Sequence, residues 1–441
     1  MGAMRSLIAT VVVVTVAWLG GLVAAAAQPD AAQSQKVLSN WYTLMLALVR
    51  HTPTYSPPVA SRSFAYVGVT VFEIVASGSG DLTSLAGQLH GLKAVPQREA
   101  GKTYDDAMAL EAALAFAAEN FFGNTGPTGQ RAMAALKAKL SADVMAGLSP
   151  DIASRSQAYG QAVAAHILAW SRSDGGAVIT NLGFPTQYQL IAGPAHWVPT
   201  NLIALQQTPL LPDWGKNRTF VLPTNTTCSL PPPPAYSEDK ASEFYKQALE
   251  IVEMKRNLTP DQRTIARVWA DDAMLSTTPP GHWISIVLQI FERDKTSLET
   301  RAEILARLGV GLADAFIGCW QTKYQYDLVR PISYIRRVFD PAWDPALNTP
   351  PFPEYPSGHS TQSGVAATVL TKLLGDHFAF EDATYLKEGL KPRAYASFWA
   401  AADEAAVSRL YGGIHFRAAI ERGLDQGRCI GAFVNALRTR R

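Results

Sequence analysis

The chain has 441 residues, of which 48% are hydrophobic and 17% charged, and its formal net charge is +2 at pH 7. This length and composition allow one large buried core or two packed ones. The nearly neutral charge, with neither a basic stripe nor an acidic tail, excludes a typical nucleic-acid-binding protein. The three cysteines, Cys228, Cys319 and Cys429, form neither a zinc pattern nor a disulfide framework, although one disulfide is possible.

The N-terminus predicts an exported protein. One arginine, Arg5, precedes a long uncharged apolar run, and small residues before Ala27 are typical of a cleavage site. We expect residues 1–27 to be a signal peptide; the alternative is an uncleaved membrane anchor, because the run is long enough to span a bilayer. No later apolar run of about 18 residues lacks charge. We therefore expect a mature protein that is periplasmic or secreted and not embedded in a membrane.

Helical periodicity covers most of the remaining chain. Apolar residues Trp41, Leu44, Met45 and Leu48 recur at helical spacing, and similar patterns continue to about residue 173. A proline-rich stretch from Gly175 to Tyr236 predicts an irregular connection that packs on the core. Helical spacing then returns and strand patterns are scarce, which predicts an all-α fold of antiparallel bundles. The interpretation gives an N-terminal helical region with the connection (28–235) and a C-terminal helical region (236–441).

Two basic residues in "KYQYDLVRP" form the first part of a candidate site. Lys323 and Arg330 are seven residues apart, so a continuous helix would present both cations on one face. Pro331 is expected to end that helix and to leave Arg330 beside a loop. The alternative interpretation is an ordinary solvated basic face.

The stretch "PSGH" forms the second part. Gly358 permits backbone geometry that other residues rarely adopt, and Ser357 or Ser360 can cap the helix that follows. Free N–H groups and the helix dipole favour an anion at such a helix start. His359, in the first turn, would touch that anion. An ordinary capped helix with a surface histidine would show the same pattern.

The third part is "SRLYGGIHFRAAIERG". Arg409 and His415 would lie on different faces of a continuous helix, but Gly412 and Gly413 break the helix and let both side chains converge. A glycine-rich helix corner with a buried histidine is the plainer alternative. Taken together, the three cations and two histidines lack a carboxylate or cysteine cluster, which favours an oxyanion over a metal cation. One histidine can attack or ligate its central atom while the other transfers protons.

In this order the three parts resemble the motif shared by vanadium-dependent haloperoxidases and type 2 phosphatidic-acid phosphatases. A looser likeness to the haloperoxidase branch extends from about Trp41 to the end and includes "RVWADDAM" and "TPPGHW". The resemblance implies two packed four-helix bundles and a site for vanadate or phosphate. His415 would be the axial vanadium ligand or the phosphatase nucleophile, and His359 the acid–base group. The equatorial oxygens would be held by Lys323, Arg330, Ser357, Gly358 and Arg409.

The same site could support either reaction, and several features favour the peroxidase. Trp320 and Phe352 stand at the positions that line the halide site in chloride- and bromide-oxidising relatives, where an apolar wall would desolvate a halide. Core packing is the alternative role of both aromatics. The partners would then be hydrogen peroxide, bromide or chloride, and a small organic acceptor. A secreted acid phosphatase with a phospho-histidine intermediate is the main alternative, and a non-catalytic anion-binding protein is a third.

One position departs from the family pattern. Many members carry an aspartate four residues after the last histidine, where this chain has Ala419. A carboxylate there would help orient or charge the imidazole, so its absence is expected to affect the metal affinity and the pH range of activity. Asp272 resembles the family's partner of the third arginine and is expected to position Arg409, with Asp271 as the competing choice.

Overall fold

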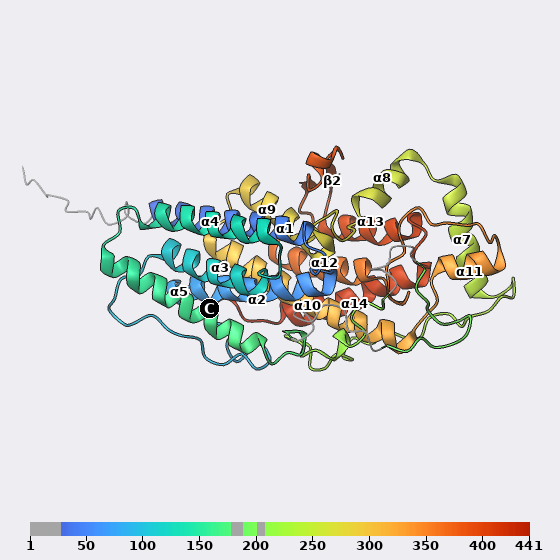
Figure 1. Ribbon diagram of the computed structural model, residues 1–441, viewed down its shortest axis with the longest axis horizontal. Coiled ribbons are helices and arrows are strands. Elements are labelled where there is room, and N and C mark those ends of the chain that lie inside the picture. Colours follow the sequence, from blue (N-terminus) through green and yellow to red (C-terminus); the bar gives the residue numbers. More distant parts are fainter. Residues whose placement is uncertain (1–27, 178–187, 201–207) are drawn as a thin grey trace, which may run out of the picture.

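The computed structural model describes residues 28–177, 188–200 and 208–441, and the expected signal peptide lies outside these ranges. Helices make up 60% of the structure and strands 3%, which confirms the all-α prediction. The molecule is elongated, with most long helices aligned along its longest axis (Figure 1).

The first helical bundle is built from the N-terminal third of the chain. Helix α3 packs against α1, α2 and α5, and α4 covers α1 and α3. Each of these helices begins with a proline or a polar cap where the sequence supplies one; Asp105, for example, accepts a hydrogen bond from the Met108 N–H at the start of α3. The bounds are α1 Gln28–Arg50, α2 Pro57–Gly78, α3 Asp106–Phe121, α4 Pro127–Met145 and α5 Pro150–Ser171.

The second bundle carries the candidate site. Helix α12 packs against α10, α13 and α14, and α10 also packs along α2 of the first bundle. This second contact is close, since a Cβ atom added to Gly68 would lie 2.6 Å from the Leu305 carbonyl oxygen and one added to Gly309 would lie 2.8 Å from that of Phe64. The bounds are α10 Leu298–Tyr326, α12 Gly358–Leu374, α13 Phe398–Tyr411 and α14 Arg417–Asn435.

Further helices and one strand pair pack around the two bundles, and among them α9 contacts α1 and α2 as well as α12. Strands β1 and β2 form an antiparallel pair in which Phe380 faces Tyr395. The remaining helices are α7 Glu243–Asn257, α8 Pro260–Val268, α9 Thr278–Asp294 and α11 Pro331–Val338. The strands are β1 Phe380–Asp382 and β2 Arg393–Tyr395, and the short 3-10 helices are η2 Trp214–Lys216 and η3 Leu386–Glu388.

The two bundles share one hydrophobic core. The larger cluster of buried apolar side chains runs from Val37 in α1 to Leu437 after α14 and so spans both bundles. A second, smaller cluster, which includes Phe244, Leu328 and Phe416, lies within the C-terminal part of the chain. The proposed boundary at residue 235 is therefore not marked by a break in the core, and it stays a prediction.

Helix α2 has the length and apolar composition of a membrane span, but every residue of its apolar window is buried inside the molecule. Its one arginine, Arg62, donates to Asp174 at 2.6 Å, and Tyr66 of the same helix donates to that carboxylate at 2.7 Å. A buried cation with a hydrogen-bonded partner is characteristic of a protein core. We assign α2 to the core.

The described parts of the proline-rich connection pack on the core, as predicted. The buried carboxylate of Asp314 on α10 accepts N–H groups of Phe220, Val221 and Leu222 at 2.7, 2.9 and 3.2 Å. A disulfide joins Cys228 of the connection to Cys429 of α14, and Cys319 is a buried free thiol. These contacts hold the connection against α10 and α14, the helices that flank the candidate site.

The disulfide should contribute to stability, because it closes a loop of 201 residues and so restricts the unfolded chain. We expect its reduction, or the double substitution Cys228→Ser with Cys429→Ser, to lower the free energy of unfolding by about 2–4 kcal/mol. Thermal unfolding with and without reductant measures the effect, and the double variant should no longer respond to reductant. An unchanged melting temperature of the reduced wild-type protein would contradict the expectation.

Candidate active site

The residues predicted from the three sequence parts meet in one place. Arg330 Nη1 lies 3.1 Å from His415 Nε2, and Arg409 Nη1 lies 3.3 Å from His359 Nε2. Lys323, Arg330, Arg409 and His415 are all at most 2% exposed. Lys323 lies at the end of α10 and Arg330 just before α11. His359 lies in the first turn of α12, and Arg409 and His415 lie on either side of the turn between α13 and α14. The convergence that the sequence predicted is confirmed, including the helix break at Gly412–Gly413.

Lys323 and Arg330 are not on one helix, and that prediction was wrong. Helix α10 ends at Tyr326, and Asp327 after it adopts a left-handed conformation with φ 46°. Pro331 starts α11 and does not end a helix, and Arg330 is the residue that precedes it. The physical reason is that proline at a first helical position loses no hydrogen bond, whereas aspartate tolerates the left-handed turn that ends α10.

Lys323 anchors the backbone that leads into α12. Its Nζ donates to the carbonyl oxygens of Pro353 and Glu354, each at 3.0 Å, and to that of Pro356. Burial, aided by the charge of Arg330, lowers the pKa of Lys323 to about 7. A bound oxyanion nearby would favour the charged form. A direct contact between Lys323 and an oxyanion stays a prediction.

His415 is held in one tautomer by a carboxylate that the sequence analysis missed. Its Nδ1 lies 2.9 Å from Glu354 Oε1, which also accepts the Phe416 N–H at 2.8 Å. The Nδ1 atom must therefore donate, which leaves the lone pair on Nε2, the atom that faces Arg330. Burial, followed by the charges of Arg330 and Lys323, holds the pKa of His415 well below its usual range. A neutral imidazole whose unprotonated Nε2 accepts only the Arg330 N–H can act as a ligand or a nucleophile once that hydrogen bond is exchanged for an anion.

Glu354 supplies the carboxylate for His415 that the chain lacks at position 419, where it has Ala419. Ala419 is fully buried, and its carbonyl oxygen accepts the Ser357 N–H at 3.0 Å, so its position supports the backbone at the start of α12. The carboxylate for His415 comes instead from Glu354. The available signal was an acidic residue in "PFPEYPSGH", where neighbouring prolines and aromatics predict burial.

His359 lies in the first turn of α12, as predicted, and contacts Asp271. Its Nε2 is 3.5 Å from Asp271 Oδ2 and its side chain is 15% exposed. Burial and the charge of Arg409 lower the pKa of His359 to about 4, although Asp271 opposes this shift. His359 is therefore neutral near pH 7 and can accept or relay a proton at the cavity.

Asp271 belongs to a buried network behind His359. His282 lies between two carboxylates, with Nδ1 3.0 Å from Asp271 Oδ1 and Nε2 2.8 Å from Asp382 Oδ2, and Tyr385 also donates to Asp271. Burial opposes the charge on His282, but the two aspartates raise its pKa to about 10. The charged His282 in turn holds the pKa of Asp271 below its usual range, despite burial. The network therefore keeps Asp271 ionised beside His359.

Replacing His282 with Gln should destabilise the protein by about 3–5 kcal/mol, because two buried carboxylates lose their cation. The folded pKa of about 10 exceeds the unfolded value of about 6.5, so this stabilisation is complete below pH about 6.5 and is lost as pH rises through 10. Denaturant unfolding from pH 6 to 10 should show a smaller pH dependence in the variant. The exposed His377→Gln is the matched control. Equal stability of the two variants would contradict the account.

Asp272 lines the cavity, and its predicted contact with Arg409 is not direct. In the described structure Arg409 donates to Ala270 O at 3.4 Å and contacts His359, and neither aspartate lies within 4.0 Å of its guanidinium. Burial raises the pKa of Asp272, whereas the charge of Arg409 lowers it, so the two side chains interact through their charges. The positioning role of Asp272 stays a prediction. Asp271, the competing choice, contacts His359 and His282 directly and not Arg409.

The start of α12 supplies the backbone part of the cradle. Ser357 caps the helix by accepting the Ser360 N–H at 3.3 Å, which decides between the two possible capping serines. Gly358 has no positive φ, so the conformational reason given for it was wrong. It lines the cavity instead, and a Cβ there would lie 3.7 Å from the Trp320 ring. The amide groups of this first turn lack partners within the helix.

The donor set fits an oxyanion. The Nη2 atoms of Arg330 and Arg409 are buried without a hydrogen-bond partner, as is the Ser360 hydroxyl. Burial lowers the pKa of both arginines to about 10, so both remain charged at neutral pH. Buried charged donors without acceptors are costly unless a ligand completes them. A vanadate- or phosphate-like ion would provide the missing acceptors.

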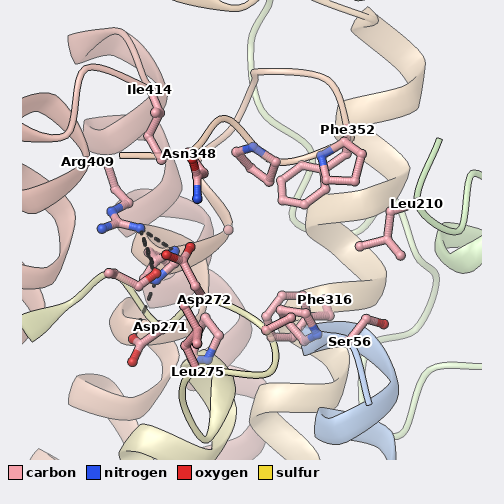
Figure 2. Close-up of a pocket in the computed structure, with 18 of the residues that line it drawn as sticks. Ser56, Leu210, Asp271, Asp272, Leu275, Phe316, Asn348, Phe352, Arg409 and Ile414 are labelled. Carbon is pink, nitrogen blue, oxygen red and sulfur yellow. Dashed lines mark hydrogen bonds and ion pairs between the residues drawn. The ribbon is translucent and has the colours of Figure 1, made fainter. Parts of the chain in front are cut away.

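The cavity beside this cradle is polar on one side and apolar on the other. Figure 2 shows Arg409, Asp271 and Asp272 opposite Phe352, Phe316 and Leu210. The volume is about 350 Å³, which suits a small organic molecule. Trp320 and Phe352 both line it, with ring centroids 4.9 Å apart, and the Phe352 centroid lies 5.0 Å from Lys323 Nζ. Both aromatics therefore line the cavity next to the cradle, and their role at a halide site stays a prediction.

Comparison with known proteins is consistent with this arrangement. The model of the VCPO second helical-bundle domain matches residues 303–440, the part that carries the cradle. Vanadium chloroperoxidase from Curvularia inaequalis is 34% identical over a match that covers 24% of this chain. That match spans 22% of the length of the Curvularia protein.

Solved structures extend the likeness to the whole fold. The crystal structure of a bacterial vanadium-dependent iodoperoxidase has a TM-score of 0.84 and 38% sequence identity, and the match covers 92% of this chain and 97% of that one. The apo form of a bacterial vanadium-dependent chloroperoxidase has a TM-score of 0.68 at 15% identity, covering 87% and 94%, which supports the fold alone. The fold and site define a helical-bundle enzyme with an oxyanion cradle. The chain belongs to the vanadium-dependent haloperoxidase family.

Proposed function

We propose that this protein is a vanadate-dependent haloperoxidase, which oxidises a halide with hydrogen peroxide and passes the oxidised halogen to a small organic acceptor. The observation that carries the proposal is the pair of buried, unpartnered Nη2 donors of Arg330 and Arg409 beside the unprotonated Nε2 of His415. Family membership supports it. The phosphatase alternative is not favoured, because the matched proteins are haloperoxidases.

Vanadate would be held by Arg330, Arg409 and the first-turn amides of α12, with Lys323 adding charge and His415 Nε2 available as a nitrogen ligand. When bound, it supplies a Lewis-acidic centre that activates hydrogen peroxide for oxygen transfer to a halide. Glu354 keeps the Nε2 lone pair of His415 directed at the cradle.

Proton transfer and halide binding are assigned to separate sides of the cavity. His359 is neutral and reaches the cavity, so it can take a proton from peroxide and return it to the leaving oxygen. Trp320 and Phe352 form an apolar wall that would strip water from a halide. Replacing either with a small polar residue is expected to change halide oxidation more than oxyanion binding.

The halide remains to be assigned by experiment. The related structure at 38% identity is an iodoperoxidase and the Curvularia relative is a chloroperoxidase. The protein should therefore be supplied with vanadate and peroxide and tested separately with iodide, bromide and chloride for halogenation of a phenolic dye. Halogenation that requires vanadate supports the proposal. Failure with all three halides by vanadate-loaded protein would contradict it.

Phosphate should inhibit halogenation by competing with vanadate, because both ions present tetrahedral oxygens to the same cations. We expect the rate to fall as phosphate is added and to recover when vanadate is raised. Potassium nitrate at the same ionic strength is the control for general screening of charges. Phosphate that inhibits no more than nitrate does would show that the two ions do not share the cradle.

We further propose that the protein is exported to the periplasm or secreted. The disulfide between Cys228 and Cys429 supports this location, because such bonds persist in oxidising compartments. The signal-like residues 1–27 are consistent with it. Fractionation of expressing cells, followed by N-terminal sequencing of the mature chain, tests both the location and cleavage near Ala27.

A further inference from the structure

The rim of the active-site cavity carries an exposed thioether. Met274 is 50% exposed and Leu275 is 68% exposed, and both line the cavity that contains His359 and His415. We propose that the oxidised halide leaves past this rim and that Met274 is the first residue it oxidises, to methionine sulfoxide. The inference rests on the proposed function and adds an exit route and a modification site.

The lining of the cavity directs the oxidant toward Met274. The cradle end is closed, since Arg409 and His415 are each 2% exposed, whereas the rim residues reach solvent. Among the described residues that line the cavity, only Met274 carries sulfur. Trp320, the one lining indole, is 1% exposed and its Nε1 donates to Leu210 O at 3.0 Å. The rest of the apolar wall, made of prolines, aliphatic side chains and the rings of Phe316 and Phe352, offers no comparable nucleophile.

The chemistry needs only the products of the proposed reaction. Peroxide, a proton and the halide give hypohalous acid and water. The Met274 sulfur then gives up two electrons to the halogen, which departs as halide, while sulfur gains one oxygen and one proton is released. The product is the sulfoxide, a polar group in place of an apolar one. At the rim it would make the entrance less favourable for an apolar acceptor.

Met145 provides a control within the same chain. It is 48% exposed, nearly the same as Met274, but it ends α4 in the first bundle. Nearby Asp143 binds Lys36 near the start of α1, whereas the cavity residue Pro53 follows the end of α1. The 17 residues between Lys36 and Pro53 correspond to roughly 25 Å of helix. An oxidant equilibrated with the solution should reach both methionines alike.

The test is mass spectrometry of the vanadate-loaded protein during turnover with peroxide and the halide that supports dye halogenation. Trypsin places each methionine alone in its peptide, 268–293 for Met274 and 140–155 for Met145. Protein treated with the same hypohalite reagent, without turnover, gives the intrinsic ratio of the two sulfoxides. Excess free methionine in the buffer removes oxidant that has already escaped. Met274→Leu should abolish the mass increase in its peptide, which assigns the modified residue.

We expect the ratio of Met274 to Met145 sulfoxide during turnover to exceed the reagent ratio by about tenfold, because oxidant formed in the cavity meets the rim at a high effective concentration. Added free methionine should suppress oxidation of Met145 and spare that of Met274. Equal ratios, with dye halogenation intact, would overturn the exit route and favour the neighbouring cavity that shares Asp272 and Asn348. Absent dye halogenation would instead count against the proposed function.

Discussion

The His415→Ala variant should lose halide oxidation by a factor on the order of 10³ while retaining weak vanadate binding. Alanine removes the imidazole nitrogen that we assign as the ligand of vanadate, whereas Lys323, Arg330 and Arg409 still attract the oxyanion. Steady-state halogenation and equilibrium dialysis with vanadate measure the two quantities separately. The cavity left by the imidazole lies beside Arg330, so the melting temperature of the variant should be recorded as well.

The His359→Ala variant is the matched comparison for His415→Ala. It removes the proton-transfer group but leaves His415 as the nitrogen ligand, so we expect vanadate to bind nearly as in the wild type while turnover falls by about 10²–10⁴. Turnover of His415→Ala at the wild-type rate would show that its role is misassigned. The same holds if His359→Ala lost vanadate affinity while His415→Ala kept it.

The Glu354→Ala variant should bind vanadate about 10–100 times more weakly, because His415 loses the acceptor that fixes its tautomer and ring orientation. Glu354→Gln keeps an oxygen that can accept from His415 and the Phe416 N–H, and it removes only the charge. We therefore expect Gln to recover much of the vanadate affinity that Ala loses.

The pH dependence of vanadate affinity distinguishes a loss of His415 positioning from general damage to the fold. Burial raises the pKa of Glu354 to about 7, although Arg330 and Lys323 oppose the shift, so wild-type vanadate affinity should change near that pH. Lys323 also titrates near pH 7 in both proteins, so only the part of the change that Glu354 causes should be absent in Glu354→Gln. A profile that stays the same in Glu354→Gln would show that the carboxylate charge has no part in positioning His415.

The residues proposed to hold the anion could be singled out from the sequence because their types are unusual in a helical chain. Lys323, Arg330, Arg409 and His415 stood out as cations and imidazoles beside glycines and a proline, in stretches otherwise made for packing. The all-α class was predictable from the 3.6-residue periodicity, which depends on local sequence alone.

The supporting residues were harder to predict because they act across long sequence separations. Glu354 lies 61 residues from His415, and Asp382 lies 100 residues from His282. A single buried carboxylate has no periodic signature, and only the three-dimensional fold shows which histidine it meets. The turn between Lys323 and Arg330 was missed for a local reason, since Pro331 can either end one helix or begin the next.

The most direct test of the central claim is a vanadate titration of one metal-free preparation, with two activities followed at each point. The retained histidines should give slow hydrolysis of p-nitrophenyl phosphate without vanadate. The account predicts that halogenation rises from zero as this hydrolysis falls, with the same apparent Kd, because one cradle serves both. Brisk hydrolysis that persists at saturating vanadate, with no halogenation at any concentration, would contradict the account.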